Sequence, residues 1–379
     1  MSVYSTDYDV FLREISKLET PSIIYNVDQL ESSIDEMTST MGEFSFIKLN
    51  FALKACYNRD VLKCLSSKNL GCDVSSRREL ELAEQMNFKQ ITSTSPYYSP
   101  DDMNYFVSKN ITLDINSLSQ LVQYGELFPN TDVGLRLKLQ KEEEVKKKKI
   151  SRFGLCIEDL ELFNTIKKYK LNIISLHMHT EMTDEEHFIK KVAFLLESLS
   201  VFPNVKTFNL GGGLLHLFLD MDKFVEVLKK TQILLENSTS FTNDMRVIIE
   251  PGSAITELSG YLLTEIVNIG RRNNEESSYV EVDTSAWSLS PWGTHQVINL
   301  SKFPSKIESK IYIYGNTCFE EDLFFSTNEK EPHLHPIGEF EIGDKLLFSS
   351  FGAYTTTNKR DFNLQKKAKE IAFKKGHIY

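Results

Sequence analysis

The chain has 379 residues, more than one hydrophobic core usually organises, so we expect two domains or one large barrel with an appendage. Its composition is globular, with 41% hydrophobic and 25% charged residues, and its net charge of −10 argues against nucleic acid and anionic membranes as main partners. The sequence shows no apolar run near the ~20 residues that span a bilayer, no signal peptide, and five unclustered cysteines without a CxxC pair. We therefore expect a cytoplasmic protein with reduced thiols.

The first 260 residues alternate short apolar strands with amphipathic helices. Residues 1–20 are expected to form a short helix or an extended arm, and residues 22–27 a strand. Eight further strands are expected at residues 44–50, at a segment ending near residue 73, and at 90–94, 111–115, 132–139, 173–179, 207–210 and 246–249. This alternation predicts a (β/α)8 barrel, which we assign to residues 22–260.

After residue 260 the helical pattern becomes rare. Strands are expected at 261–269, 278–282, 310–314 and 345–349, with turns rich in Gly, Asn and Asp between them. This pattern predicts a β-sandwich or β-barrel domain over residues 261–379, joined by the N-terminal arm 1–21. The segment 362–370 is expected to be helical, and the charge run 142–149 a solvated loop at the barrel mouth, with a lid as the alternative.

Lys54 follows the expected strand 44–50 directly. Its neighbours Leu53 and Ala55 are apolar, so its amine should be partly desolvated, which favours the neutral, nucleophilic form. Schiff-base chemistry with pyridoxal phosphate requires such an amine. The ordinary alternative is a lysine that extends its amine from a strand end into solvent.

Two more candidate positions follow the seventh and eighth strands of the barrel. Three successive glycines, Gly211 to Gly213, allow backbone N–H groups to approach an anion, and this is the usual phosphate position in the fold. Glu250 precedes Pro251 and Gly252, where a carboxylate could bind a protonated pyridine nitrogen. The alternatives are a flexible turn and a surface glutamate.

His177 and His179 end the sixth strand and share one face of it. They could form a stacking surface for an aromatic cofactor, or a metal-binding pair of the kind found in metal-dependent amidohydrolases. Those hydrolases are expected to carry the pair on the first strand and an aspartate on the last, whereas this chain has the sixth strand and Glu250. Satisfied core histidines are the third reading.

Two further candidates lie in the expected β domain. Cys318 and Asp322 place a thiol and a carboxylate four residues apart, and Tyr354 follows a glycine in a late loop. A buried structural cysteine and a packed tyrosine are the ordinary alternatives.

Taken together, these residues resemble the fold-type III pyridoxal-phosphate decarboxylases, the ornithine and diaminopimelate decarboxylase family with its alanine racemase-type barrel. The resemblance runs from about Pro21 to Asn363 in one order. It rests on the segments 51–55 (Phe-Ala-Leu-Lys-Ala), 71–76 with Glu79, 151–154 (Ser-Arg-Phe-Gly), 176–179 (Leu-His-Met-His), 210–213 (Leu-Gly-Gly-Gly), 250–252 (Glu-Pro-Gly), Cys318 with Asp322, 352–355 (Gly-Ala-Tyr-Thr) and 362–363 (Phe-Asn).

The resemblance implies a role for each residue. The catalytic residues would be Lys54, His179, Cys318 and Asp322, and the cofactor-binding residues Lys54, Asp73, His179, Gly211, Gly212, Gly213, Glu250, Gly252, Ser253 and Tyr354, with no metal. Lys54 would carry pyridoxal 5'-phosphate, His179 would stack on its ring, and Glu250 would bind its ring nitrogen. The glycines, the loop after Glu250 and Tyr354 would hold the phosphate. Cys318, the proton donor, and Asp322 would come from the partner in a head-to-tail homodimer.

Three departures from the family pattern bear on the substrate and the phosphate. Ser253 stands where the family usually has arginine, and Met182 lies where a Gly-Ser pair usually helps to bind phosphate. Phe319 stands where the family usually has an acidic residue that contacts the distal amino group of the substrate. We therefore expect decarboxylation of an amino acid bulkier than ornithine, lysine or diaminopimelate, as in siderophore, peptide-antibiotic or polyamine-like biosynthesis.

Three other classes of protein share parts of this pattern. An amino-acid racemase of the same fold would characteristically have arginine near the pyridine nitrogen, which disagrees with Glu250. A catalytically inactive regulatory homologue would not need to keep Lys54, Cys318 and Asp322 together. The small pyridoxal-phosphate carrier proteins have the barrel alone, whereas this chain also has a β domain.

Overall fold

The structure, a computed structural model, describes residues 6–138, 151–180, 182–271, 278–291, 293, 295–304, 309–326 and 334–379. The chain divides into two compact units. The barrel unit comprises Ile34–Lys54 and Leu65–Ala254, and the β unit comprises Met1–Ser33, Ala55–Cys64 and Ile255–Tyr379. The charge run 142–149, and with it the expected loop or lid, lies outside the described residues.

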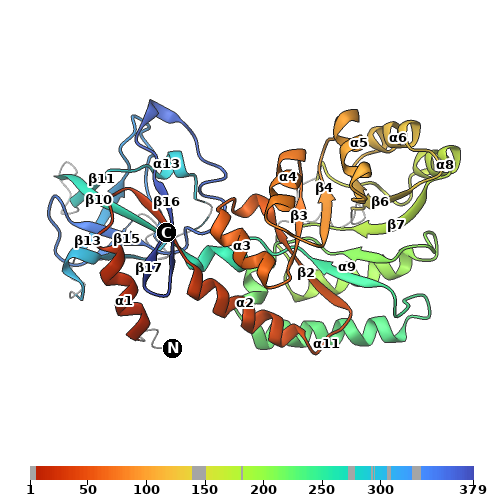
Figure 1. Cartoon of the computed structure of the whole chain (residues 1–379), viewed down its shortest axis with the longest axis horizontal. Helices are drawn as coiled ribbons and strands as arrows, with labels where there is room; N and C mark the ends of the chain where they lie inside the picture. Colours follow the sequence, from red (N-terminus) through yellow and green to blue (C-terminus); the bar gives the residue numbers. More distant parts are fainter. Residues whose placement is uncertain are drawn as a thin grey trace. The chain divides into compact units, whose positions relative to one another are not determined.

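The barrel unit contains eight parallel strands that close into a barrel (Figure 1). In chain order they are β2 (Ile47–Ala52), β3 (Gly71–Val74), β4 (Ile91–Thr94), β5 (Leu113–Ile115), β6 (Asp132–Arg136), β7 (Asn172–His177), β8 (Thr207–Asn209) and β9 (Arg246–Ile249). The last strand pairs with the first, with Ile47 opposite Val247. The expected (β/α)8 barrel is therefore confirmed.

Helices between the strands lie around the barrel (Figure 1). They are α4 (Arg77–Gln85), α5 (Pro100–Ser108), α6 (Leu118–Leu127), α8 (Leu160–Tyr169), α9 (Glu185–Ser198), α10 (Leu215–Phe218) and α11 (Met221–Asn237). Side-chain caps fix where several of them begin: Ser76 accepts a hydrogen bond from the Glu79 N–H, and Ser99 and Asp102 form a reciprocal capping box. Both caps follow a strand closely, so the loops after β3 and β4 are short.

The β unit contains a mixed sheet of nine strands among its described residues. They are β1 (Ser22–Asn26), β10 (Gly260–Arg271), β11 (Ser278–Val282), β12 (Val297–Asn299), β13 (Ser309–Tyr314), β14 (His335–Ile337), β15 (Lys345–Phe348), β16 (Lys369–Lys374) and β17 (His377–Ile378). The main path runs β14-β13-β11-β10-β1-β16-β17, and β15 joins β10 to β12. The second expected domain is thus a separate mixed sheet.

The remaining helices and helical turns of the described chain differ in length. They are α1 (Thr6–Ile15), α2 (Val27–Met41), η1 (Leu53–Ala55), α3 (Arg59–Ser67), α12 (Ser253–Thr256), η2 (Glu257–Ser259), α13 (Ala286–Leu289), η3 (Leu300–Lys302) and η4 (Phe362–Leu364). The first of them packs on the mixed sheet, where Phe11 and Ile15 are fully buried against Leu263 and Phe373. The N-terminal arm therefore belongs to the core of the β unit.

Two local expectations differ from the structure. β1 pairs antiparallel with β10 and parallel with β16, so residues 22–26 lie in the sheet of the β unit, whereas we expected the barrel to begin at residue 22. The segment 362–370 was expected to be helical, but it forms only the short turn η4 before β16 begins at Lys369. For residues 22–26, the partner strands β10 and β16, both far away in sequence, decide the outcome.

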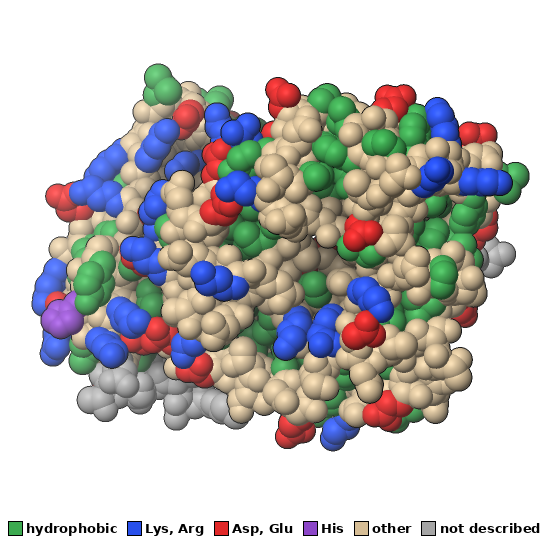
Figure 2. All heavy atoms as spheres, turned by 45° about the vertical axis from the view of Figure 1, so that its right-hand side comes forward, with side chains coloured by type: hydrophobic (Ala, Val, Ile, Leu, Met, Phe, Trp, Pro, Cys, Tyr) green, Lys and Arg blue, Asp and Glu red, His purple; other side chains and the backbone are tan. Residues whose placement is uncertain are grey.

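The surface is mixed in charge. Figure 2 shows acidic and basic side chains interspersed on the face in view. Exposed ion pairs in the described chain include Lys206 with Asp244 at 2.6 Å and Lys68 with Asp35 at 2.6 Å. No helix in the described part of the chain is both long and apolar enough to cross a membrane.

Candidate active site

Charged and polar side chains stand at or directly after the C-terminal ends of the barrel strands. They are Lys54 after β2, Asp73 in β3, Asp114 in β5, Arg136 in β6, His177 in β7, Asn209 in β8 and Glu250 after β9. In a parallel barrel these ends meet at one mouth. All of them except Lys54 are buried, so their charges interact strongly, which is typical of a catalytic site.

Lys54 lies in η1, and its amine is 3.8 Å from the Asp73 carboxylate. The side chain of Lys54 is 44% exposed, whereas that of Asp73 is buried. Burial raises the pKa of Asp73 well above its ordinary value, the charge of Glu250 adds to this, and the positive charge of Lys54 opposes it. The amine is therefore held by a buried carboxyl group and is also open to an incoming aldehyde.

Glu250 is fixed in the barrel mouth by Asn209. The Asn209 side-chain amide donates a hydrogen bond to Oε1 of Glu250 at 2.5 Å, and its carbonyl oxygen accepts one from the Gly211 N–H at 3.0 Å. Asn209 is fully buried and Glu250 is 3% exposed. One amide therefore sets both the direction of the carboxylate and the start of the glycine loop, which we define as residues 210–213.

His177 faces the second oxygen of the same carboxylate. Its Nδ1 forms a hydrogen bond with the hydroxyl of Thr94 at 3.1 Å, and its Nε2 is 3.7 Å from Oε2 of Glu250. Burial, followed by the charge of Arg136, lowers the pKa of His177 well below its ordinary value, so the ring is neutral. Among the described residues none forms a hydrogen bond with Nε2. A neutral imidazole thus borders Glu250, and the pair is not an ion pair.

His179 is held by the glycine loop. The Gly212 N–H donates a hydrogen bond to Nδ1 of His179 at 2.9 Å, so the neutral ring carries its proton on Nε2. Burial and the charge of Lys54 lower the pKa of His179 well below its ordinary value. A Cβ on Gly211, at φ +67°, would lie 2.7 Å from the ring of His179, so a side chain has no room there. The loop therefore fixes the orientation of this ring.

The glycine loop differs in one respect from the expected phosphate site. The N–H groups of Gly211 and Gly212 already donate hydrogen bonds inside the protein, to Asn209 and His179. The residues whose N–H groups are still expected to donate to the phosphate are Gly213, at φ +78°, and Gly252 and Ser253 at the start of α12. Sequence alone does not reveal which way each N–H group points.

Asp114 and Arg136 were missed by the sequence analysis. Burial raises the pKa of Asp114 to about 7, and a Cβ on Gly134 would lie 1.9 Å from its carboxylate. The guanidinium of Arg136 lies 4.5 Å from the centre of the Phe153 ring, within the segment 151–154. A lone acid and a lone arginine inside apolar strands, each near the C-terminal end, were the signal that could have identified them.

The alternative of a metal site concerns His177, His179 and Glu250. Within the described ranges, no group of three or more His, Cys, Asp or Glu residues is placed to hold a metal ion. The two histidines use Nδ1 for different partners, Thr94 and Gly212, so the rings do not converge on one ligand position through these atoms.

In the β unit, Cys318 is exposed and Asp322 is buried. The Cys318 N–H donates to the side chain of Asn363 at 2.8 Å. One carboxylate oxygen of Asp322 accepts from the Trp287 N–H at 2.9 Å, and the other accepts from the N–H and the hydroxyl of Thr317 at 3.2 and 2.5 Å. The carboxylate is 1% exposed, and these bonds hold the Cys318 loop, which we define as residues 315–322. The catalytic role expected for Asp322 stays a prediction.

Tyr354 lies in a loop of the β unit with φ +60°, which is uncommon for a residue other than glycine. Its N–H donates a hydrogen bond to the carbonyl of Ala55, the residue after Lys54, at 2.7 Å. The side chain is half-buried. The backbone contact fixes the position of this loop within the β unit.

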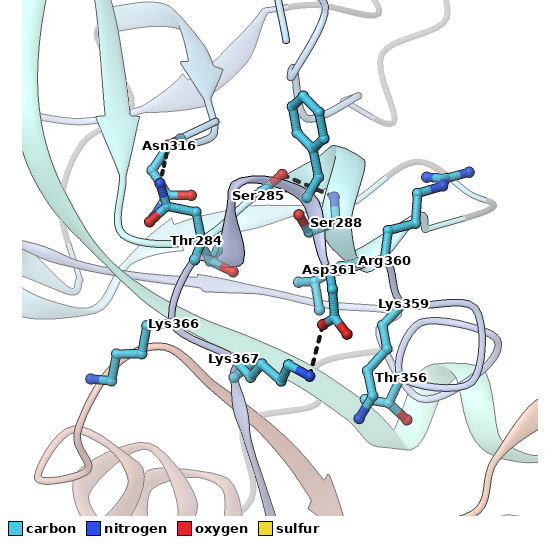
Figure 3. A pocket seen from close by; sticks show the side chains of 14 residues that line it. Thr284, Ser285, Ser288, Asn316, Thr356, Lys359, Arg360, Asp361, Lys366 and Lys367 are labelled. Carbon is cyan, nitrogen blue, oxygen red and sulfur yellow. Dashed lines mark hydrogen bonds and ion pairs between the residues drawn. The ribbon is translucent and has the colours of Figure 1, made fainter. Parts of the chain in front are cut away.

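Two pockets in the β unit border the Cys318 loop. The larger, about 610 Å3, is lined by Trp287, Phe319, Glu320, Glu321 and Arg360, among others. The smaller, about 40 Å3, lies along the loop that carries Asn363, and Figure 3 shows its basic side chains and the ion pair of Asp361 with Lys367, at 2.7 Å. The ring centres of Trp287 and Phe319 are 4.2 Å apart, so the residue that follows Cys318 in sequence, Phe319, belongs to an aromatic pair.

Comparison with known proteins identifies the family. Residues 27–257 match the model of the pyridoxal-binding domain of the pyridoxal-dependent decarboxylases. This match covers more than half of the chain, which therefore belongs to that family and is a pyridoxal-phosphate-dependent carboxy-lyase.

Relatives match over nearly the whole chain. A diaminopimelate decarboxylase from Buchnera aphidicola is 26% identical over 97% of this chain and 92% of its own length. A carboxynorspermidine/carboxyspermidine decarboxylase from Campylobacter jejuni is 25% identical over 92% and 91%. Among solved structures, diaminopimelate decarboxylase from M. jannaschii has a TM-score of 0.82 at 19% identity, with 97% and 90% of the two chains covered. The arginine decarboxylase of Paramecium bursaria Chlorella virus has a TM-score of 0.79 at 19% identity, with 96% and 99% covered. These structures confirm the fold.

The residues at the barrel mouth fit the cofactor of the family. The half-exposed amine of Lys54 suits the aldehyde of the cofactor, and the fixed carboxylate of Glu250 suits its basic ring nitrogen. The glycine loop, which has no room for side chains, suits its phosphate. The expected cofactor, pyridoxal 5'-phosphate, is therefore confirmed by the family and fits this site.

Proposed function

We propose that this chain decarboxylates an α-amino acid, with Lys54 as the attachment point of the cofactor. Bound pyridoxal phosphate supplies the electron sink for the pair that is released when the bond to the carboxylate breaks. The observation that carries the proposal is the fixed carboxylate of Glu250, with Oε1 bound by Asn209 and Oε2 facing neutral His177. An acid held in this way keeps a ring nitrogen protonated, which favours loss of carbon dioxide over racemisation.

The remaining residues of the barrel mouth orient the reactants. His179 presents its ring at an angle set by Gly212, as stacking on a planar cofactor requires. The Asp73 carboxylate, 3.8 Å from the Lys54 amine, can stabilise the positive charge of that amine. Gly213, Gly252 and Ser253 bind the phosphate in this proposal.

Cys318 is the proposed proton donor, supplied by the partner subunit of a head-to-tail homodimer. Its side chain is exposed, and the loop that carries it is shaped by Asp322 and Asn363. These local bonds would present the thiol to a second copy of the chain. Tyr354 is proposed to contribute to the phosphate site, as the family resemblance implies.

The proposed substrate is an amino acid with a long, amine-bearing side chain. Phe319 and Trp287 give the large pocket an aromatic wall, while Glu320 and Glu321 give it two acids, which suits a chain of methylene groups and ammonium groups. A carboxypolyamine, the class named for the Campylobacter relative, matches this description better than diaminopimelate does. Siderophore and peptide-antibiotic intermediates are the second candidates.

Cofactor attachment is tested by reduction with borohydride and peptide mapping. A visible absorbance band that disappears, with a pyridoxyl label on Lys54, is the expected result. A label on another lysine would overturn the assignment of Lys54. The variant Lys54→Ala should take up no label, while Lys48→Ala, at an exposed lysine in β2, should be labelled like the native protein.

The reaction is tested with carboxynorspermidine, carboxyspermidine, diaminopimelate, ornithine and arginine, each labelled in the carboxylate. We expect release of labelled carbon dioxide, with kcat/KM at least about tenfold higher for the carboxypolyamines. Preference for diaminopimelate or ornithine would refute the substrate proposal. Inversion of the α-carbon without release of carbon dioxide would instead identify a racemase, and cofactor binding without either reaction a regulatory homologue.

Phe319→Glu tests the role of the aromatic wall. It should lower kcat/KM for carboxypolyamines and raise kcat/KM for diaminopimelate, because a carboxylate at position 319 would then face the distal amino group of the smaller substrate. Tyr97→Glu adds the same charge at an exposed aromatic residue of the barrel unit and should leave the preference unchanged.

A further inference from the structure

Lys191 is a fully buried lysine in the middle of α9. Its amine donates hydrogen bonds to the hydroxyl of Thr183 at 2.9 Å and to the carbonyl of Leu210 at 3.0 Å. Lysine is rarely buried completely, because removing its charge from water is costly. Its neighbour Lys190 is exposed and forms an ion pair with Glu186 at 2.8 Å. The burial of Lys191 therefore calls for a specific reason.

The glycine loop supplies that reason, because the carbonyl oxygens of residues 210–213 all accept hydrogen bonds from protein donors. The donors in loop order are the Lys191 amine, the Glu250 N–H, the Thr183 hydroxyl and the Thr183 N–H, at 3.0, 2.8, 3.3 and 2.9 Å. Partial negative charge on these oxygens is thereby directed into the protein. An anion that approaches the loop is spared repulsion from them.

Thr183 and Lys191 act as one unit in this arrangement. Thr183 is 2% exposed, and its hydroxyl bridges the Lys191 amine and the carbonyl of Gly212. Loss of either residue would release at least one carbonyl of the loop. The positive charge also reaches the rest of the site, since it contributes to the lowered pKa of His177 and of His179.

We propose that Lys191, together with Thr183, holds the glycine loop in an anion-binding conformation and places a buried positive charge behind it for the phosphate of the cofactor. Lys191 is a positioning residue in this role. In this chain Ser253, at the start of α12, brings no charge to the expected phosphate position, and Met182 is 63% exposed. The inference rests on the proposed phosphate position and is independent of the substrate.

The test compares two ligands that differ only in the phosphate. Apoenzyme is titrated with pyridoxal 5'-phosphate and with pyridoxal, and binding is followed by absorbance. Lys191→Met should weaken binding of the phosphorylated ligand at least about tenfold and leave that of pyridoxal within about twofold. Lys190→Met, one residue earlier on the same helix, should change neither affinity. Equal weakening of both ligands, or no change, would overturn the proposal.

Thr183 provides a second test in case Lys191→Met does not fold. Thr183→Val keeps the shape of the side chain and removes its hydroxyl, so the ratio of the two affinities should fall by about threefold to tenfold. Thr183→Ser should restore the native ratio. Inorganic phosphate should raise the melting temperature of native apoenzyme and should do so less for Thr183→Val; an unchanged ratio would refute the proposal. Absence of carbon dioxide release with normal cofactor binding would refute the proposed function and leave this inference standing.

Discussion

The amide of Asn209 is the contact whose removal has the most readily worked consequence. Asn209→Ala deletes a hydrogen bond to the buried carboxylate of Glu250 at 2.5 Å and one to the Gly211 N–H at 3.0 Å. A hydrogen bond to a charged group contributes about 1.5–3 kcal/mol to stability, and a neutral one about 1 kcal/mol. The expected loss in the free energy of unfolding is therefore about 2.5–4 kcal/mol, before any effect of the cavity.

The measurement is urea denaturation of the apoenzyme, followed by circular dichroism. Asn204→Ala is the matched control, since it removes one exposed hydrogen bond to Asn172 at 2.8 Å and should cost less than about 0.5 kcal/mol. If Asn209→Ala costs no more than this control, the reasoning on Glu250 fails. A stable variant that binds the cofactor with an unchanged spectrum would contradict the role of Asn209 in directing the carboxylate.

Three further predictions follow from single residues. The pKa of Asp114 is raised from 3.8 to about 7, so the folded state binds the proton of this carboxyl group more tightly than the unfolded chain does. The stability of the native protein should therefore fall as the pH rises from 4 to 7. Above pH 7, Asp114→Asn should be more stable than the native protein, by roughly 4 kcal/mol at most. Chemical denaturation at several pH values measures this, and parallel pH curves for the two proteins would refute it. Gly211→Ala should disturb the ring of His179, which its Cβ would approach to 2.7 Å, and should weaken cofactor binding; native affinity would contradict the geometry. Mixing Lys54→Ala with Cys318→Ala subunits should restore about a quarter of the native activity if sites are shared in a dimer, and none if each chain is complete by itself.

The barrel could be predicted from sequence because its signals are local. The strands are short apolar runs, several of them are followed by a capped helix, as at Ser76 and Ser99, and the parallel strands close in chain order. β1 has every residue buried, so its sequence reads the same in a barrel and in a mixed sheet. Only its pairing with β10 and β16, which are remote in sequence, decides between the two.

The candidate site was predictable to the level of position but not of contact. Lys54, His179 and Glu250 follow from the rule that functional groups stand at strand ends, and Asp73 from the family resemblance. The burial of Asp322 does not follow, because its hydrogen-bond partners Trp287 and Thr317 come from a loop geometry that no residue pattern encodes. For the same reason the directions of the glycine N–H groups, and with them the role of Lys191, required coordinates.

The pairing of β1 with β16 also has a consequence for biosynthesis. Ser22 lies beside Lys369, so a strand made among the first residues pairs with one made roughly 350 residues later, which is tens of seconds at ribosomal speed. During that interval β1 has β10 as its earliest partner and an edge still open on its other side. The nascent chain therefore carries an apolar, pairing-competent strand through most of its translation, and we expect chaperones that bind extended apolar segments to recognise residues 22–26 before they recognise any part of the barrel.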